Sequence, residues 1–172
     1  MADYLEIYLN DHLGGATGGV ELAQRLAENN EDTPFADFLR ELAVGIVQDR
    51  DELQRLMDEL GVKQDKVKAA GAFVLEKLAR MKANGQLTGY SPLSRMLEME
   101  MLHVGITGKL ELWSALREVF GSRLKTFDLE RLIERAETQR TELEQRRLQA
   151  AREALGDSSV VRSWQANSAA AG

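Results

Sequence analysis

The chain has 172 residues, of which 44 % are hydrophobic and none is cysteine, and its formal net charge at pH 7 is −6. This length and composition suit a single globular domain with a sizeable core. The lack of cysteine excludes disulfides, iron–sulfur clusters and thiolate zinc sites, and the acidic balance argues against a nucleic-acid-binding domain.

The beginning of the chain, Met1 to Tyr4, has neither the basic region nor the apolar segment of a secretory signal. No stretch of the sequence approaches the ~18 uncharged apolar residues that a membrane-spanning helix needs. The sequence therefore predicts a cytoplasmic protein without a membrane span, and the absence of cysteine agrees with a reducing compartment.

Helix-capping and helix-breaking residues divide the chain into five predicted helices. Thr33-Pro34 and Ser91-Pro92 each offer a side-chain cap, followed by a proline at the first helical position, where no backbone N–H is needed. Glycine ends the helices, as at Gly61. The predicted helices span Asp3–Glu28, Pro34–Leu60, Asp65–Ala83, Pro92–Phe120 and Asp128–Leu155.

Four of these helices are long, roughly 40 Å each at 1.5 Å per residue. Each carries apolar residues at alternating steps of three and four, which is the period of a buried helical stripe. Short turns between long helices favour antiparallel neighbours. We expect a helical bundle domain over residues 1–156, followed by a flexible Ser- and Ala-rich tail over residues 157–172 that contains Trp164.

The predicted helix Asp65–Ala83 differs from the others in charge. Residues 61–85 hold six Lys or Arg against two Asp or Glu, which leaves −10 for the rest of the chain. A short basic helix between two long hairpins is typical of a crossover connection along the bundle. Its surface either balances the acidic helices or docks a protein or other anionic partner. The basic residues are Lys63, Lys66, Lys68, Lys77, Arg80 and Lys82.

Two long antiparallel hairpins joined by a crossover resemble the ferritin-like superfamily, particularly its bacterial stress-associated members. The resemblance implies an all-α, ferritin-like four-helix bundle of two antiparallel hairpins with an additional crossover helix. In the metal-binding members, a Glu on each of two helices and a Glu-x-x-His on each of the other two hold the ions. This chain has one such motif, from Glu100 to His103, and none in the helix Pro34–Leu60.

A polar layer interrupts the apolar stripes near the middle of the predicted bundle. His12 and Asp49 belong to this layer. If the chain reverses direction midway between these two residues, they lie at the same level of the first hairpin and face each other. A buried polar group is costly without a partner, so we expect a structural hydrogen bond between the two side chains. The alternatives are exposure of one or both, or a metal site that adds Glu100, His103 and Glu144. That set of ligands suits iron or manganese, and without it no cofactor is expected.

The first predicted helix contains four glycines, each of which costs about 0.5–1 kcal/mol relative to alanine in a helix interior. They are Gly14, Gly15, Gly18 and Gly19. Close helix packing is the expected compensation, because Gly105, Thr107 and Gly108 form a matching patch of small residues on a later helix. A break in the helix and space for a ligand beside His12 are the alternatives.

The sequence gives no support to nucleophilic catalysis, since it has no cysteine and no Gly-x-Ser-x-Gly elbow. Its two histidines leave general acid–base catalysis open. Because no catalytic motif is found, we expect that the protein is not an enzyme. We expect a metal-free, ferritin-like binding or structural protein that self-associates as a homo-oligomer. The alternative is a metal-binding ferritin-like protein with oxidase or storage activity.

Overall fold

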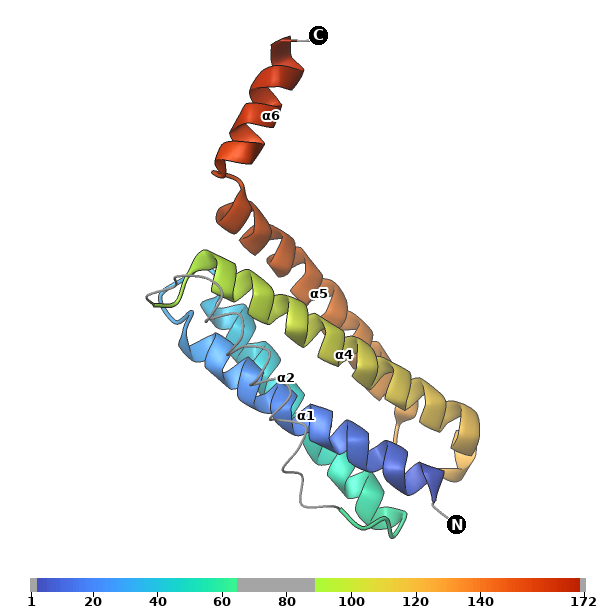
Figure 1. The fold of residues 1–172 in the computed structure, drawn as a ribbon. Helices are drawn as coiled ribbons and strands as arrows, with labels where there is room; N and C mark the ends of the chain where they lie inside the picture. Colours follow the sequence, from blue (N-terminus) through green and yellow to red (C-terminus); the bar gives the residue numbers. More distant parts are fainter. Residues whose placement is uncertain (1–2, 65–88, 171–172) are drawn as a thin grey trace.

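The computed structural model describes residues 3–64 and 89–170, and over these residues the chain consists of helices and turns (Figure 1). The helices are α1 (Tyr4–Glu28), α2 (Ala36–Glu59), α4 (Pro92–Phe120), a 3₁₀ turn (Gly121–Arg123), α5 (Leu129–Leu155) and α6 (Ser159–Ala170). The expected all-α class is confirmed for this part of the chain. None of the described helices combines the length and the apolar character that crossing a membrane requires.

Local sequence signals set the starts of α1 and α4. Asp3 caps α1, because its carboxylate accepts the backbone N–H of Leu5 at 2.9 Å. Ser91 caps α4 in the same way through the N–H of Ser94 at 3.1 Å, and a proline follows it. Both caps agree with the predicted helix starts.

The helix α2 begins at Ala36, two residues after the predicted Pro34. The hydroxyl of Thr33 accepts the N–H of Phe35 at 3.3 Å within a turn that precedes the helix. Phe35 is 0 % exposed. Burying such a ring stabilises the fold by about 1.5–3 kcal/mol, more than the roughly 1 kcal/mol of a side-chain cap. The N–H of Ala36 bonds the carbonyl of Thr33 at 3.1 Å, so a turn precedes the first residue of α2.

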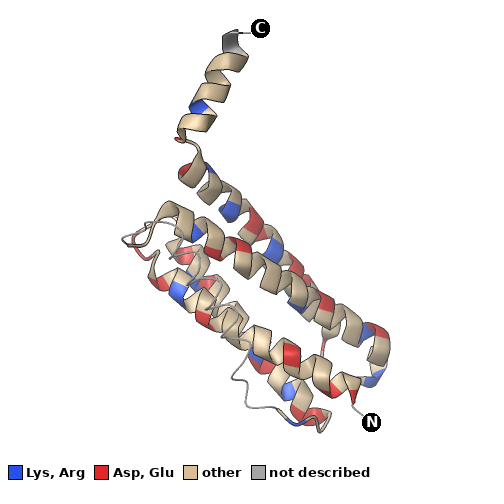
Figure 2. Cartoon of the chain, in the orientation of Figure 1, with Lys and Arg blue, Asp and Glu red and all other residues tan. Residues whose placement is uncertain are grey.

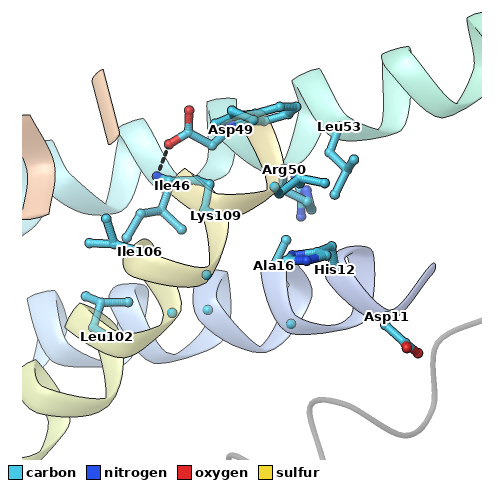
Figure 3. A pocket seen from close by; sticks show the side chains of 16 residues that line it. Asp11, His12, Ala16, Ile46, Asp49, Arg50, Leu53, Leu102, Ile106 and Lys109 are labelled. Atoms are coloured by element: carbon cyan, nitrogen blue, oxygen red, sulfur yellow. Dashed lines mark hydrogen bonds and ion pairs between the residues drawn. The ribbon is translucent and has the colours of Figure 1, made fainter. Parts of the chain in front are cut away.

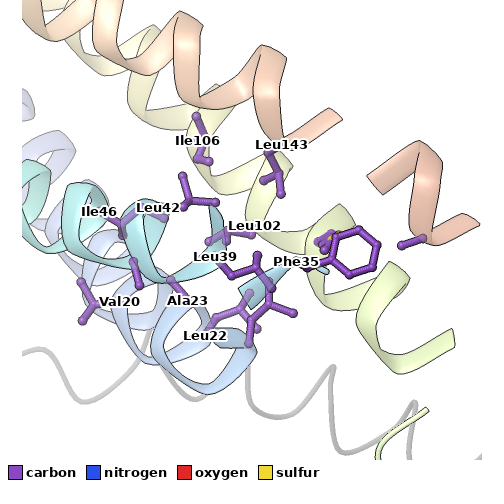
Figure 4. Close-up of a cluster of buried hydrophobic side chains, with 14 of the residues drawn as sticks. Val20, Leu22, Ala23, Phe35, Leu39, Leu42, Ile46, Leu102, Ile106 and Leu143 are labelled. Atoms are coloured by element: carbon purple, nitrogen blue, oxygen red, sulfur yellow. The ribbon is translucent and has the colours of Figure 1, made fainter. Parts of the chain in front are cut away.

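The four long helices pack side by side, with α1 against α2 and α4, and α4 against α5 (Figure 1). One cluster of buried apolar side chains joins the end of α1 and the start of α2 to the start of α4 and the end of α5. Phe35, Leu102 and Leu143 belong to it (Figure 4). A second cluster, which includes Leu13 and Trp113, joins the opposite ends of the same helices. The helices α1 and α2 therefore run antiparallel to each other, and so do α4 and α5.

The described residues on either side of the stretch 65–88 lie far apart. The carbonyl of Lys63 accepts a hydrogen bond from Nδ2 of Asn10, near the start of α1, at 3.0 Å. The hydroxyl of Tyr90 accepts one from Nδ2 of Asn30, just past the end of α1, at 2.8 Å. About 20 residues of helix, or roughly 30 Å, separate the two contacts. The predicted crossover helix Asp65–Ala83 itself lies outside the described residues.

A buried polar cluster closes the end where α4 begins. Asn30 is buried and donates to the Tyr90 hydroxyl, which donates to Oε2 of Glu98 at 3.1 Å. Nη2 of Arg25 lies 3.1 Å from Oε1 of Glu98, and Nε of Arg95 donates to Oδ1 of Asn30. Burial and the Glu98 charge raise the pKa of Tyr90, so its hydroxyl remains a donor. The cluster ties the α1–α2 turn to α4.

The residues predicted as a flexible tail include a helix, α6, which extends away from the four long helices (Figure 1). Val160 and Trp164 on this helix are 75 % and 70 % exposed. None of the side chains of residues 159–168 is buried, so the helix has no apolar stripe on the core that the periodicity of the sequence could reveal.

Candidate ligand-binding cavity

A half-open cavity of about 320 Å³ lies between α1, α2 and α4, and most of its lining is apolar (Figure 3). It borders both apolar clusters. Its large apolar residues are Ile46, Leu53, Leu102, Ile106, Leu112 and Trp113. Its polar and charged residues are Asp11, His12, Asp49, Arg50 and Lys109.

Glycines of α1 and α4 leave this space open. A Cβ atom built on Gly15, Gly19, Gly105 or Gly108 would meet none of the described residues within 4 Å, apart from its own helical turn. Close packing, the favoured interpretation of the sequence, is therefore wrong at Gly15 and Gly19, whereas Gly14 and Gly18 of the same helix are buried. A break in α1 is also wrong, because the helix continues without interruption. The remaining alternative, space beside His12, agrees with the structure.

Glycine destabilises the interior of a helix, and at these four positions no packing contact with the described residues offsets that destabilisation. Four glycines in helix interiors cost about 2–4 kcal/mol in total relative to alanine. The net stability of a whole domain is only about 5–15 kcal/mol. Contacts among the described residues therefore do not explain Gly15, Gly19, Gly105 and Gly108.

The wall of the cavity carries a compact group of buried charges. Asp49 of α2 is 3 % exposed, and its carboxylate accepts hydrogen bonds from Nζ of Lys109 in α4 and Nη2 of Arg135 in α5. Nζ of Lys109 also donates to Oε1 of Gln139 in α5. Burial lowers the pKa of Lys109, and the charge of Asp49 opposes that shift. Asp49 thus joins three helices and neutralises the ammonium group beside the cavity.

His12 and Asp49 line the same cavity, but the hydrogen bond predicted between them is not formed. Both carboxylate oxygens of Asp49 accept from cations of α4 and α5. The ring of His12 meets the ring of Tyr8 edge-on, with centroids 4.5 Å apart. Charged donors bind a carboxylate more strongly than a neutral imidazole does, which explains the difference. Burial lowers the pKa of His12 against the opposing charge of Asp11, so the neutral ring is favoured.

The other predicted metal ligands lie at a separate place. Glu100, His103 and Glu144 line a surface hollow between α4 and α5. Arg147 bonds both carboxylates there, Glu144 at 2.7 and 2.8 Å and Glu100 at 3.2 Å. Its hydrogen bond lowers the pKa of Glu144. The five predicted ligands are thus divided between two sites, and the described residues contain no group of three or more His, Asp or Glu suited to hold a metal ion.

Sequence analysis missed the partners of Asp49. Lys109 lies three residues after Ile106 and four before Trp113, so it shares their buried stripe on α4. This spacing was the available signal. Lysine is rarely buried unless it is paired, which makes a solvent-facing position the ordinary expectation. Arg135 and Gln139 come from α5, and nothing in the spacing along α2 points to them.

One of the six basic residues predicted as a docking surface, Lys63, belongs to the described part of the chain, where it is exposed. Figure 2 shows acidic and basic residues interspersed along the four long helices. The docking surface stays a prediction. The other five basic residues lie outside the described ranges: Lys66, Lys68, Lys77, Arg80 and Lys82.

Comparison of the chain with protein-family models, with curated protein sequences and with solved structures finds no match. The functional interpretation therefore depends on the cavity, its glycines and the chemistry of its walls.

Proposed function

We propose that this protein binds a small apolar molecule in the cavity between α1, α2 and α4. The observation that carries the proposal is the open space at helix-interior glycines around an apolar cavity of about 320 Å³. An apolar protein cavity of ~150 Å³ holds benzene, and small-molecule sites typically measure ~300–1,000 Å³. The cavity therefore suits a molecule of about two fused rings or a hydrocarbon chain of similar volume.

The charges around the cavity favour an uncharged ligand. Lys109 is paired with Asp49, and Nη2 of Arg50 donates to Asp51 at 2.6 Å. Both cations that line the cavity in the described chain thus have carboxylate partners. Asp11 is exposed, and its side chain points away from the other labelled residues (Figure 3). An anionic ligand would have to compete with Asp49 and Asp51 for these cations, whereas an apolar one gains about 25 cal/mol per Å² of surface removed from water.

The order of the helices supports a ferritin-like arrangement as part of the proposal. The pair α1–α2 and the pair α4–α5 are antiparallel, and the chain leaves α2 and enters α4 at opposite ends of α1. A long connection along the helices is what a ferritin-like bundle requires. Ligand binding without metal chemistry agrees with the ion pairs that Arg147 forms with Glu100 and Glu144.

Calorimetric titration with 2-isopropenylnaphthalene, an uncharged two-ring hydrocarbon, tests the proposal on the full chain. Gly108→Leu extends a branched side chain into the space that a Cβ leaves open. We expect its Kd to rise at least about tenfold, because the side chain occupies volume that the probe needs. Val104→Leu is the matched control, since position 104 is 70 % exposed on the same helix, and its Kd should equal that of the wild type.

Two results would contradict the proposal: a wild-type protein that does not bind the hydrocarbon, and equal Kd values for wild type and Gly108→Leu. Urea unfolding of both leucine variants separates lost binding from lost folding. Leucine has a higher helix propensity than glycine, so Gly108→Leu is expected to be at least as stable as the wild type.

A further inference from the structure

His12 of α1 is a half-buried titratable side chain in the wall of the cavity, where it lies beside Ala16 (Figure 3). Among the described residues its ring meets Tyr8 edge-on and takes part in no hydrogen bond or ion pair. Burial lowers the pKa of His12, and the charge of Asp11 opposes this shift. At neutral pH the wall therefore presents an uncharged imidazole to the cavity.

The charged groups of α2 and α4 in the same wall offer no free carboxylate to a protonated His12. Asp49 already binds Lys109 and Arg135, so one carboxylate is shared by two cations and the group as a whole is positive. Arg50, the other cation of the wall, is paired with a carboxylate of α2. An imidazolium would thus face positive rather than negative charge from these helices.

Two further carboxylates lie near His12 in the described chain, and both are exposed. Asp11 points away from the other labelled residues (Figure 3). Glu111 of α4 acts on Tyr8, whose pKa is raised by burial and then by the charge of Glu111. Water screens exposed charges of this kind. Neither carboxylate therefore replaces the water that an imidazolium would lose to a ligand in the cavity.

We propose that protonation of His12 releases the ligand, so that the cavity binds at neutral pH and empties in mildly acidic solution. An uncharged apolar ligand removes water from the ring beside it. The neutral ring tolerates this loss better than an imidazolium without a partner does. The inference rests on the proposed function and adds a regulation of the same site, in which a proton and the ligand compete.

Calorimetric titration with 2-isopropenylnaphthalene at about pH 7.5 and about pH 5.5 tests the inference on the full chain. The hydrocarbon has no titratable group, so a change in Kd reflects the protein. We expect the wild-type Kd to rise about threefold or more between the two conditions, with a limit of about tenfold per pH unit for one proton. His12→Gln is uncharged in both and should bind with nearly the same Kd.

The second histidine of the chain provides the matched control. His103 lines the separate hollow between α4 and α5. His103→Gln removes a titratable ring away from the cavity and should keep the pH dependence of the wild type. Urea unfolding of the wild type and both variants in both buffers establishes that binding is measured on folded protein.

Proton NMR of the imidazole rings supplies a measurement without any change in the cavity. Saturating hydrocarbon should move the titration of the wild-type His12 ring to lower pH, because the bound ligand disfavours the imidazolium. The His103 ring should titrate as it does in the free protein. The spectrum of His12→Gln assigns the two sets of signals.

Equal pH dependence of Kd in the wild type and His12→Gln would overturn the inference. A His12 titration that the hydrocarbon leaves unchanged would overturn it too, as would loss of the pH dependence in His103→Gln. Hydrocarbon binding at neutral pH would survive each of these results, and with it the proposed function. A wild-type protein that does not bind the hydrocarbon at neutral pH would overturn the proposed function itself.

Discussion

Asp49 is a single buried side chain that organises the middle of the molecule. Removing a carboxylate from water costs several kcal/mol unless strong partners replace the solvent, and cations from two other helices do so here. Gly45, one turn before it on α2, makes room for this arrangement. A Cβ at Gly45 would lie 2.7 Å from Nε2 of Gln139, the residue that also accepts from Lys109.

We predict that Asp49→Asn destabilises the protein by about 3–5 kcal/mol, because it leaves two cations beside a neutral amide in a buried position. Urea unfolding at neutral pH measures the loss. The control is Asp51→Asn, whose carboxylate is on the surface and should contribute less than about 1 kcal/mol. Similar losses for the two variants would show that Asp49 is solvated in the folded protein.

His12 should make stability depend on pH near neutrality. Burial lowers its folded-state pKa below the ordinary value of 6.5, with Asp11 opposing. The unfolded chain then binds the proton more readily, so stability falls as the pH drops through 6.5. Urea unfolding from about pH 7.5 to about pH 5.5 should show a smaller loss for His12→Gln than for the wild type. An identical loss in both proteins would mean that the imidazole is solvated.

The local sequence signals predicted the bounds of some helices more accurately than those of others. The helix α4 spans Pro92–Phe120 as predicted, because a Ser91 cap and a terminal glycine bound it. The helices α1 and α5 begin one residue after their predicted first residues, which act as N-caps. The helix α2 begins two residues later than predicted, because residues 33–36 form a turn in which the N–H of Ala36 bonds the carbonyl of Thr33.

The glycines of α1 lead to a prediction at the level of the helix. Gly15→Ala and Gly19→Ala should each raise stability by about 0.5–1 kcal/mol, because a Cβ there meets open space and alanine favours the helix. Gly45→Ala is the control, since its Cβ would press on Gln139, and it should not gain this stability. Urea unfolding compares the three variants. Destabilisation by Gly15→Ala would mean that the helices approach closely there after all.

Over the whole described molecule, two apolar clusters hold the helix ends and the cavity lies between them. The polar cluster of Asn30, Tyr90 and Glu98 fixes one end through hydrogen bonds between distant parts of the chain. The middle is less tightly filled, because small residues occupy the positions where α1 and α4 face each other. This is the space in which the proposed ligand would bind. Self-association stays a prediction from the sequence.

Local signals in the chain were enough to establish the helical class, the bounds of α4 and the shared level of His12 and Asp49. Caps and the 3.6-residue period act within one helix or one hairpin, so they can be recognised there. Packing between helices settled that Lys109 and Arg135, rather than His12, satisfy Asp49, and that the glycines border a cavity. Both outcomes depend on the distance between helix axes and on side chains from other helices. The spacing of residues along one helix contains no information about either.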